Sequence, residues 1–201
     1  MKLKPLLLIT SLALNAVAGP LSFDFKDPKG VNTVSFKLDA PLEAISGSAQ
    51  GVTGTINFDP EHPEATRGKI VIAAASLNVP NGMMKEHMLG ANWLDAAKHP
   101  EITFEAKDVK NARTEGDTTT ADVAGTFTLK GVARDITVPV KLTYLKDKLG
   151  ARVPNQKGDL LVVRANFSIK RSDFNIMAGQ NEDKVSNAID LPLSIAGSCP
   201  R

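Results

Sequence analysis

The sequence contains a single cysteine, Cys199, two residues from the C-terminus. One cysteine cannot form a disulfide bond within the chain, so the fold must be stable without such a bond. No His or Lys lies beside Cys199 in the sequence to activate its thiol. We therefore expect an unpaired thiol near the end of the chain rather than a nucleophile.

The sequence also lacks an excess of charge of either sign. It has 24 Lys and Arg residues against 22 Asp and Glu residues, and no basic run. Proteins that bind nucleic acid neutralise phosphates with clustered Lys and Arg side chains. We therefore expect no nucleic-acid partner.

Motifs of catalysis and metal binding are missing as well. No G-x-S-x-G, G-x-G-x-x-G or phosphate-binding loop is present, and Ala91 stands where an H-E-x-x-H helix would need a second histidine after His87. His62 and His99 each precede a proline at spacings that match no metal-ligand pattern. We expect no catalytic residue, no metal and no cofactor, although a catalytic pair from distant strands stays open.

No apolar run is long enough to span a membrane, which takes about 20 residues. The N-terminus instead combines a basic start, an apolar run over residues 6–14 and alanines at A-x-A spacing before Gly19. This pattern predicts a cleaved signal peptide at residues 1–18, followed by one domain at residues 19–201. We expect an exported protein without stable membrane insertion.

Most of the remaining chain alternates between apolar and polar residues, as strands with one buried face do. The clearest example is residues 135–144, and similar runs separated by turn-forming residues give about eight or nine strands. Because no βαβ rhythm is present, the pattern predicts an all-β protein with one antiparallel β-barrel. Few aromatic residues weakly favour a cavity inside it, and a flattened sandwich remains the alternative.

One stretch, at about residues 82–98, reads as a bent helical flap between two strands. Asn81 can cap a first helical turn that carries Met84 and Met88 and ends at Gly90, and Asn92 can cap a second turn. Methionine suits surfaces that adapt to irregular apolar partners. Two interpretations stay open, because the flap can be a core plug at one barrel end or a lid that contacts a ligand.

Several of these segments together resemble the YceI-like family. They include E-H-x-x-x-x-x-W-L-D-A-x-K-x-P-x-I-T-F, beginning at Glu86, and I-K-R-S-D-F, beginning at Ile169, within a match over nearly the whole chain after the signal. The resemblance implies a lipocalin-like extended barrel whose apolar pore holds a polyisoprenoid, a quinone-like molecule or a fatty chain. It also implies a periplasmic location.

The resemblance also implies the site. Arg171 and Asp173 are expected to form a structural ion pair, or else to contact a polar ligand head. The chain departs from the family pattern at His99, Lys130 and Asn175. The expected ligand-binding residues are Met84, His87, Met88, Trp93, Leu94 and Phe104 around the flap, Ile169, Arg171 and Phe174 at a strand end, and Phe36, Phe58, Phe127, Leu129, Val140 and Phe167 in the pore wall.

The expected function is to carry or sequester a long-chain isoprenoid-like or fatty amphiphile. One rival is an enzyme that acts on a lipid or quinone precursor in the same cavity. The other is a stress-related interaction protein whose barrel is filled with side chains. The expected partner is a hydrophobic small molecule, and the sequence leaves a homodimer open.

Overall fold

The computed structural model describes residues 19–27 and 29–201, so the predicted signal peptide lies outside the described residues. Strands account for most of this part of the chain, with two short helices and three 3-10 turns. The strands are β1 (Leu21–Asp24), β2 (Thr33–Asp39), β3 (Ala44–Ala49), β4 (Val52–Phe58), β5 (Arg67–Ala73), β6 (Leu77–Asn78), β7 (Glu101–Glu115), β8 (Thr118–Leu129), β9 (Val132–Leu145), β10 (Gly158–Lys170) and β11 (Ala188–Pro200). The helices are α1 (Gly82–Leu89) and α2 (Leu149–Arg152), and the 3-10 turns are Pro63–Ala65, Ala74–Ser76 and Arg171–Phe174.

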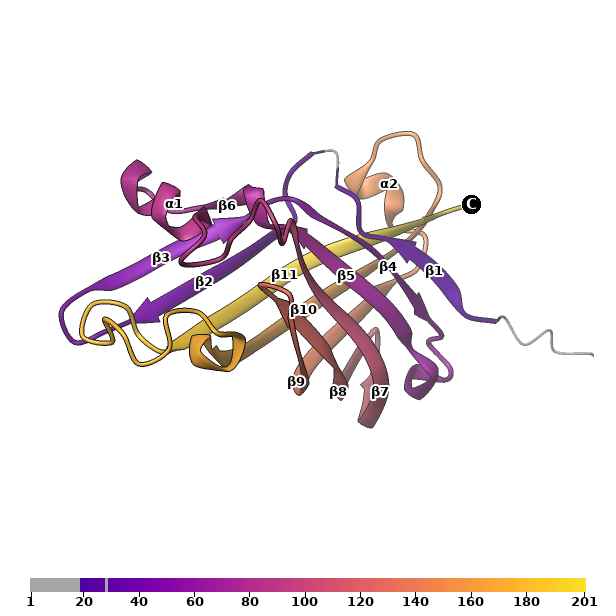
Figure 1. The fold of residues 1–201 in the computed structure, drawn as a ribbon. Coiled ribbons are helices and arrows are strands. Elements are labelled where there is room, and N and C mark those ends of the chain that lie inside the picture. The colour runs from indigo at the N-terminus through magenta and orange to yellow at the C-terminus, as the bar shows by residue number, and fades with distance from the viewer. Residues whose placement is uncertain (1–18, 28) are drawn as a thin grey trace, which may run out of the picture.

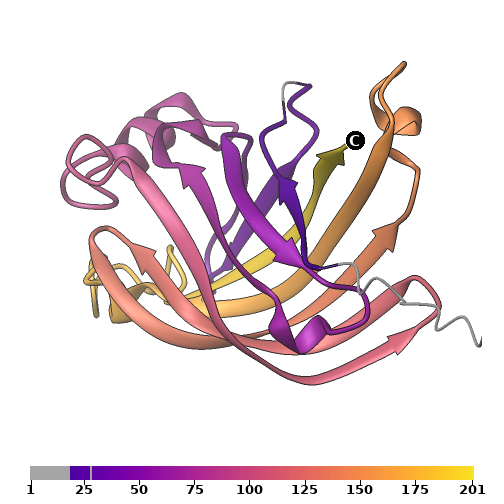
Figure 2. The ribbon, with the colours of Figure 1, turned by 90° about the vertical axis from the view of Figure 1, so that its right-hand side faces the viewer.

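Eight strands close into an antiparallel barrel. The hydrogen-bonded order is β1-β4-β5-β7-β8-β9-β10-β11, and β11 returns to β1 through the pair Asp24 and Ser198. Figure 2 shows these strands curving around a common interior. The predicted barrel of about eight antiparallel strands is therefore confirmed.

The barrel is extended at one end because two different strands pair with the same edge of β11. Its C-terminal part meets β1, while Asp190, Leu193 and Ser194 pair with β2, which continues the wall through β3 and β6. The flap at α1 lies over this extension, and α2 and the C-terminus lie at the opposite end (Figure 1). We call these the flap end and the C-terminal end.

The side chains along each strand alternate between the interior and solvent, as the sequence pattern predicts. In β9, Val138 and Leu142 are buried, whereas Lys141, which points to the opposite face of the strand, is exposed. In β8, Gly125 leaves room for the ring of Phe104, since a Cβ atom there would lie 2.7 Å from the ring. The alternation gives one apolar interior and one polar outer surface.

The interior packs as two main apolar clusters, one at each end. At the C-terminal end, Phe23, Phe25 and Phe58 are fully buried, and Tyr144 packs against the ring of Phe58 with 6.2 Å between ring centroids. At the flap end, Phe127 and Phe174 make an edge-to-face contact at 5.6 Å. The candidate site lies between these two ends.

Candidate functional site: an apolar cavity along the barrel

The barrel encloses a cavity of about 230 Å³. Its lining residues come from all the long strands of the barrel and from the flap. Almost all of them are aliphatic or aromatic, and the polar side chains among them are Thr66, Thr103 and Arg171. Such a surface can hold an apolar molecule but offers little to orient a polar one.

Strand register explains why neighbouring strands present one apolar surface to the cavity. In antiparallel strands, directly opposed residues point to the same face. Ile169 faces Ile189, and Phe167 faces Leu191, across the β10–β11 ladder. Lining residues recur along β10 from Val163 to Ile169, a distance of about 20 Å at roughly 3.3 Å per residue. The cavity is therefore long and narrow.

Eleven of the fifteen residues expected from the sequence line this cavity. They come from strands on opposite sides of the barrel and from the flap, so the fold brings together residues that are far apart in the sequence. They are Phe36, Met88, Trp93, Leu94, Phe104, Phe127, Leu129, Val140, Phe167, Ile169 and Arg171.

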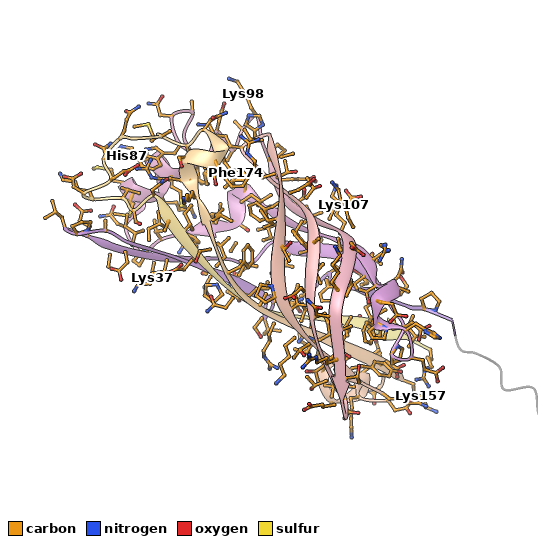
Figure 3. All side chains as sticks on the ribbon, turned by 90° about the horizontal axis from the view of Figure 1, so that it is seen from below. Lys37, His87, Lys98, Lys107, Lys157 and Phe174 are labelled. Carbon is orange, nitrogen blue, oxygen red and sulfur yellow. The ribbon has the colours of Figure 1, made fainter. Side chains whose placement is uncertain are left out.

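The other four expected residues are not part of the lining. Phe58 belongs to the cluster at the C-terminal end, and Phe174 is buried against Phe127 in the cluster at the flap end. Met84 is partly buried against the apolar cluster at the flap end, whereas His87 is exposed on α1. Figure 3 shows His87 and Phe174 at the flap end and Lys157 at the opposite end. A period of two assigns a face to a residue, but not its position along the barrel.

The flap begins as predicted and continues differently. The side chain of Asn81 accepts a hydrogen bond from the backbone amide of Met84 at 3.0 Å, and α1 is capped by Gly90. The expected second helical turn capped by Asn92 is wrong, because residues 91–98 form successive turns in which amides such as those of Trp93 and Asp95 donate to the carbonyl of Gly90. These turns direct Trp93 toward the interior.

The flap combines features of a plug and a lid. Met88, Trp93 and Leu94 pack against the apolar cluster at the flap end and also line the cavity. None of the three is fully buried, and α1 has no buried residue. The flap therefore covers the cavity without being part of a fully packed core.

Arg171 is the charged residue of the cavity lining, and its side chain is fully buried. Its guanidinium donates to five backbone carbonyls of the loop that follows the β10 strand, those of Ile176 (2.9 Å), Met177, Gln180, Val185 (3.1 Å) and Ser186 (3.2 Å). Burial lowers the pKa of Arg171 from its ordinary value. These carbonyls compensate for the buried charge.

The expected ion pair between Arg171 and Asp173 is wrong. Asp173 is exposed, and among the described residues the guanidinium has no carboxylate partner. The guanidinium instead lies over the ring of Trp93, 5.8 Å from its centroid. Arg171 thus joins the loop at residues 175–187 to the flap. Its guanidinium satisfies backbone carbonyls of this loop and does not pair with a carboxylate.

The three departures from the family pattern lie together at the turn between β8 and β9. The ammonium of Lys130 donates to the carbonyls of Asn92 and Asn175, both at 3.3 Å. The imidazole of His99 packs against Gly131, where a Cβ atom would come within 2.6 Å of the ring. The departures therefore form one contact between the flap, this turn and the loop after β10.

A polar network closes the C-terminal end. Arg201 donates to both carboxylate oxygens of Asp159 at 2.5 and 2.7 Å, and the hydroxyl of Tyr144 donates to the same carboxylate at 2.8 Å. Burial and this contact raise the pKa of Tyr144 to about 12. Burial alone would raise the pKa of Asp159, but hydrogen bonds from Arg201, the Asp147 amide and Tyr144 outweigh it and lower that pKa.

Sequence reasoning missed many wall residues that follow the same rule as those it found. They are aliphatic residues on the inward phase of predicted strands, and the alternation that identified Val140 could have identified them too. Examples are Val34, Leu38, Ile70, Val123, Val138, Leu142, Val163, Leu191 and Leu193.

Metal-binding clusters and membrane-spanning helices are absent from the residues that the structure describes. No group of three or more His, Cys, Asp or Glu side chains there could hold a metal ion. Over the same residues, the helices are too short or too polar to cross a bilayer.

The closed antiparallel barrel and its long apolar cavity define a lipocalin-like barrel protein. The family model of the YceI-like domain matches residues 29–196. The chain therefore belongs to the YceI-like domain family. Protein YceI of Escherichia coli is 29% identical over 198 residues, covering 96% of this chain and 97% of the relative.

Solved structures share the fold. BcnA of Burkholderia cenocepacia superposes with a TM-score of 0.67 at 23% identity, covering 82% of this chain and 95% of that one. A polyisoprenoid binding domain from Saccharophagus degradans, implicated in plant cell wall breakdown, superposes with a TM-score of 0.64 at 13% identity, covering 90% of this chain and 99% of that one. Both confirm the barrel architecture.

Proposed function

We propose that this protein binds one long-chain isoprenoid-like or fatty amphiphile in its barrel cavity and carries or sequesters it in the periplasm. The observation that carries the proposal is the cavity itself, about 230 Å³ in volume and lined almost wholly by apolar side chains. The same fold is a polyisoprenoid binding domain in Saccharophagus degradans. The signal-like sequence at residues 1–18 supports export.

The energy of binding would come from burial. Each methylene group removed from water contributes about 0.8 kcal/mol, so a chain of about ten carbons gives a large gross driving force even after the cost of association. The length and narrowness of the cavity favour a single flexible chain over a compact ring system. No charged anchor inside the cavity is required.

Two rival functions are less well supported. An enzyme would need an ionisable group free to act in the cavity, and the donors of Arg171 are already engaged by backbone carbonyls. A barrel filled with side chains would leave no space of this size at its centre. The filled barrel predicts that added prenyl chains do not bind stoichiometrically, whereas the enzyme predicts that a bound chain is converted to a different product.

A titration of lipid-extracted protein with prenyl alcohols of increasing length tests the proposal. Affinity should rise with chain length until the cavity is full, at a stoichiometry of one. Ile70→Phe adds a ring to the cavity wall and should weaken binding of the longest chains, whereas Lys69→Phe changes the adjacent exposed position and should not. No binding at any length would overturn the proposal.

A further inference from the structure

The barrel wall splits between β9 and β10. The two strands pair from Leu145 and Leu160 to Val140 and Ala165, but both continue beyond that point without pairing to each other. Pro139 directly precedes Val140, the last residue of β9 that pairs with β10. Proline has no backbone N–H, so it cannot donate a hydrogen bond that would continue the ladder.

A groove on the outer surface meets the cavity at this split. Val140, Ala165 and Leu193 contribute to the wall of both the groove and the cavity. The Ala165 side chain is small, so little material separates the outside from the interior beside it. A narrow chain could therefore pass between β9 and β10 where the ladder ends.

Three cations line the same groove in one row across the sheet. Arg113 faces Thr120, Thr120 faces Lys141, and Lys141 faces Arg164, so their side chains share the outer face. Adjacent strands lie about 4.8 Å apart, which places Lys141 and Arg164 side by side. Like charges directly opposite one another destabilise a sheet.

No carboxylate compensates this row among the described residues. Arg113, Lys141 and Arg164 are exposed and form no ion pair there. The groove contains one carboxylate, Asp122, and that carboxylate accepts a hydrogen bond from the Asn111 amide at 2.7 Å. The groove thus keeps a net positive charge where it meets the apolar interior.

We propose that this groove binds the anionic headgroup of the ligand, a phosphate or a carboxylate, while the chain enters the cavity between β9 and β10 just past their last pair, Val140 and Ala165. This inference rests on the proposed function, since it assumes a chain inside the barrel. Guanidinium and ammonium groups form charge-assisted hydrogen bonds with such oxyanions. The natural ligand is then an acidic amphiphile, with its head outside the barrel and its chain inside.

The test compares two probes with the same chain, geranylgeranyl phosphate and geranylgeraniol. Wild-type protein should bind the phosphate at least about tenfold more tightly, and the preference should shrink as salt screens the cations. The double variant Lys141→Gln/Arg164→Gln should lose the preference and keep its affinity for the alcohol. Lys69 is an exposed lysine on β5 outside the groove, so Lys69→Gln should keep both the preference for the phosphate and the affinity for the alcohol.

Further arms separate the remaining outcomes. Ala165→Phe fills the opening and also narrows the cavity, so it should remove the preference for the phosphate over the alcohol whatever it does to the affinity for the alcohol. Inorganic phosphate at the same concentrations should not displace geranylgeranyl phosphate if the chain fixes the head in place. Equal wild-type affinity for the two probes, or a preference that survives in the double variant, overturns this inference alone. Binding of neither probe overturns the proposed function as well.

Discussion

Replacing Arg171 with methionine removes the group that connects the loop at residues 175–187 to the barrel. The substitution keeps an apolar stem of similar length but leaves five carbonyls without their donor. A buried acceptor left unsatisfied costs about 1 to 3 kcal/mol. Ile176 is buried, whereas Gln180 is exposed, so water can replace some of the lost bonds.

Counting about two carbonyls that water cannot reach gives a loss of roughly 2 to 6 kcal/mol in the free energy of unfolding. For a domain of this size each kcal/mol lowers the melting temperature by about 2 to 4 °C, so the shift should be on the order of 10 °C. Urea unfolding followed by far-UV circular dichroism measures the loss. The matched variant Lys170→Met changes an exposed neighbour and should stay within about 0.5 kcal/mol. An Arg171→Met protein as stable as Lys170→Met would refute this account of the loop.

Three other predictions concern the flap, the C-terminal end and the β8–β9 turn. Met88→Ala should weaken binding of a prenyl chain by roughly 1 kcal/mol because Met88 lines the cavity, and Met84→Ala should change it little; calorimetric titration compares them. The pKa of Asp159 is lower in the folded protein than its unfolded value of about 3.9, so this carboxylate stabilises the fold above that pH, and the stabilisation is lost as the pH falls through the folded pKa. Asp159→Asn should therefore flatten the fall in melting temperature between about pH 5 and 3. Gly131→Ala should cost at least about 1 kcal/mol in thermal unfolding, because φ is +73° and the new Cβ meets His99; an unchanged melting temperature would show that the turn relaxes freely.

The barrel could be predicted because the alternation of apolar and polar residues shows where most of its strands lie and which face of each strand is buried. Residues such as Val138, Lys141 and Leu142 fall on the faces that a period of two assigns. The sequence signal was weaker where residues are small. β3 (Ala44–Ala49) was missed because AISGSA has no strong apolar alternation, and the 3-10 turn at Ala74–Ser76, which follows β5, has no signal in the alternation either.

The site could be predicted only in part. Membership in the wall follows from strand phase, so Phe127 and Phe167 were within reach. Position along the barrel follows from register and closure, which explains why Phe58 lies in the cluster at the C-terminal end. The carbonyl partners of Arg171 lie in a loop whose path is set by tertiary contacts, and no local pattern in the sequence shows them.

Native mass spectrometry of the intact protein, purified without detergent, tests the central claim most directly. The account predicts a species heavier than the polypeptide by the mass of one long-chain amphiphile, which organic extraction removes and an added prenyl chain restores. The same cycle should shift and then restore the emission of Trp93, the only tryptophan, which lines the cavity. A protein that carries no added mass and takes up no chain after extraction would contradict the claim that the barrel binds a lipid.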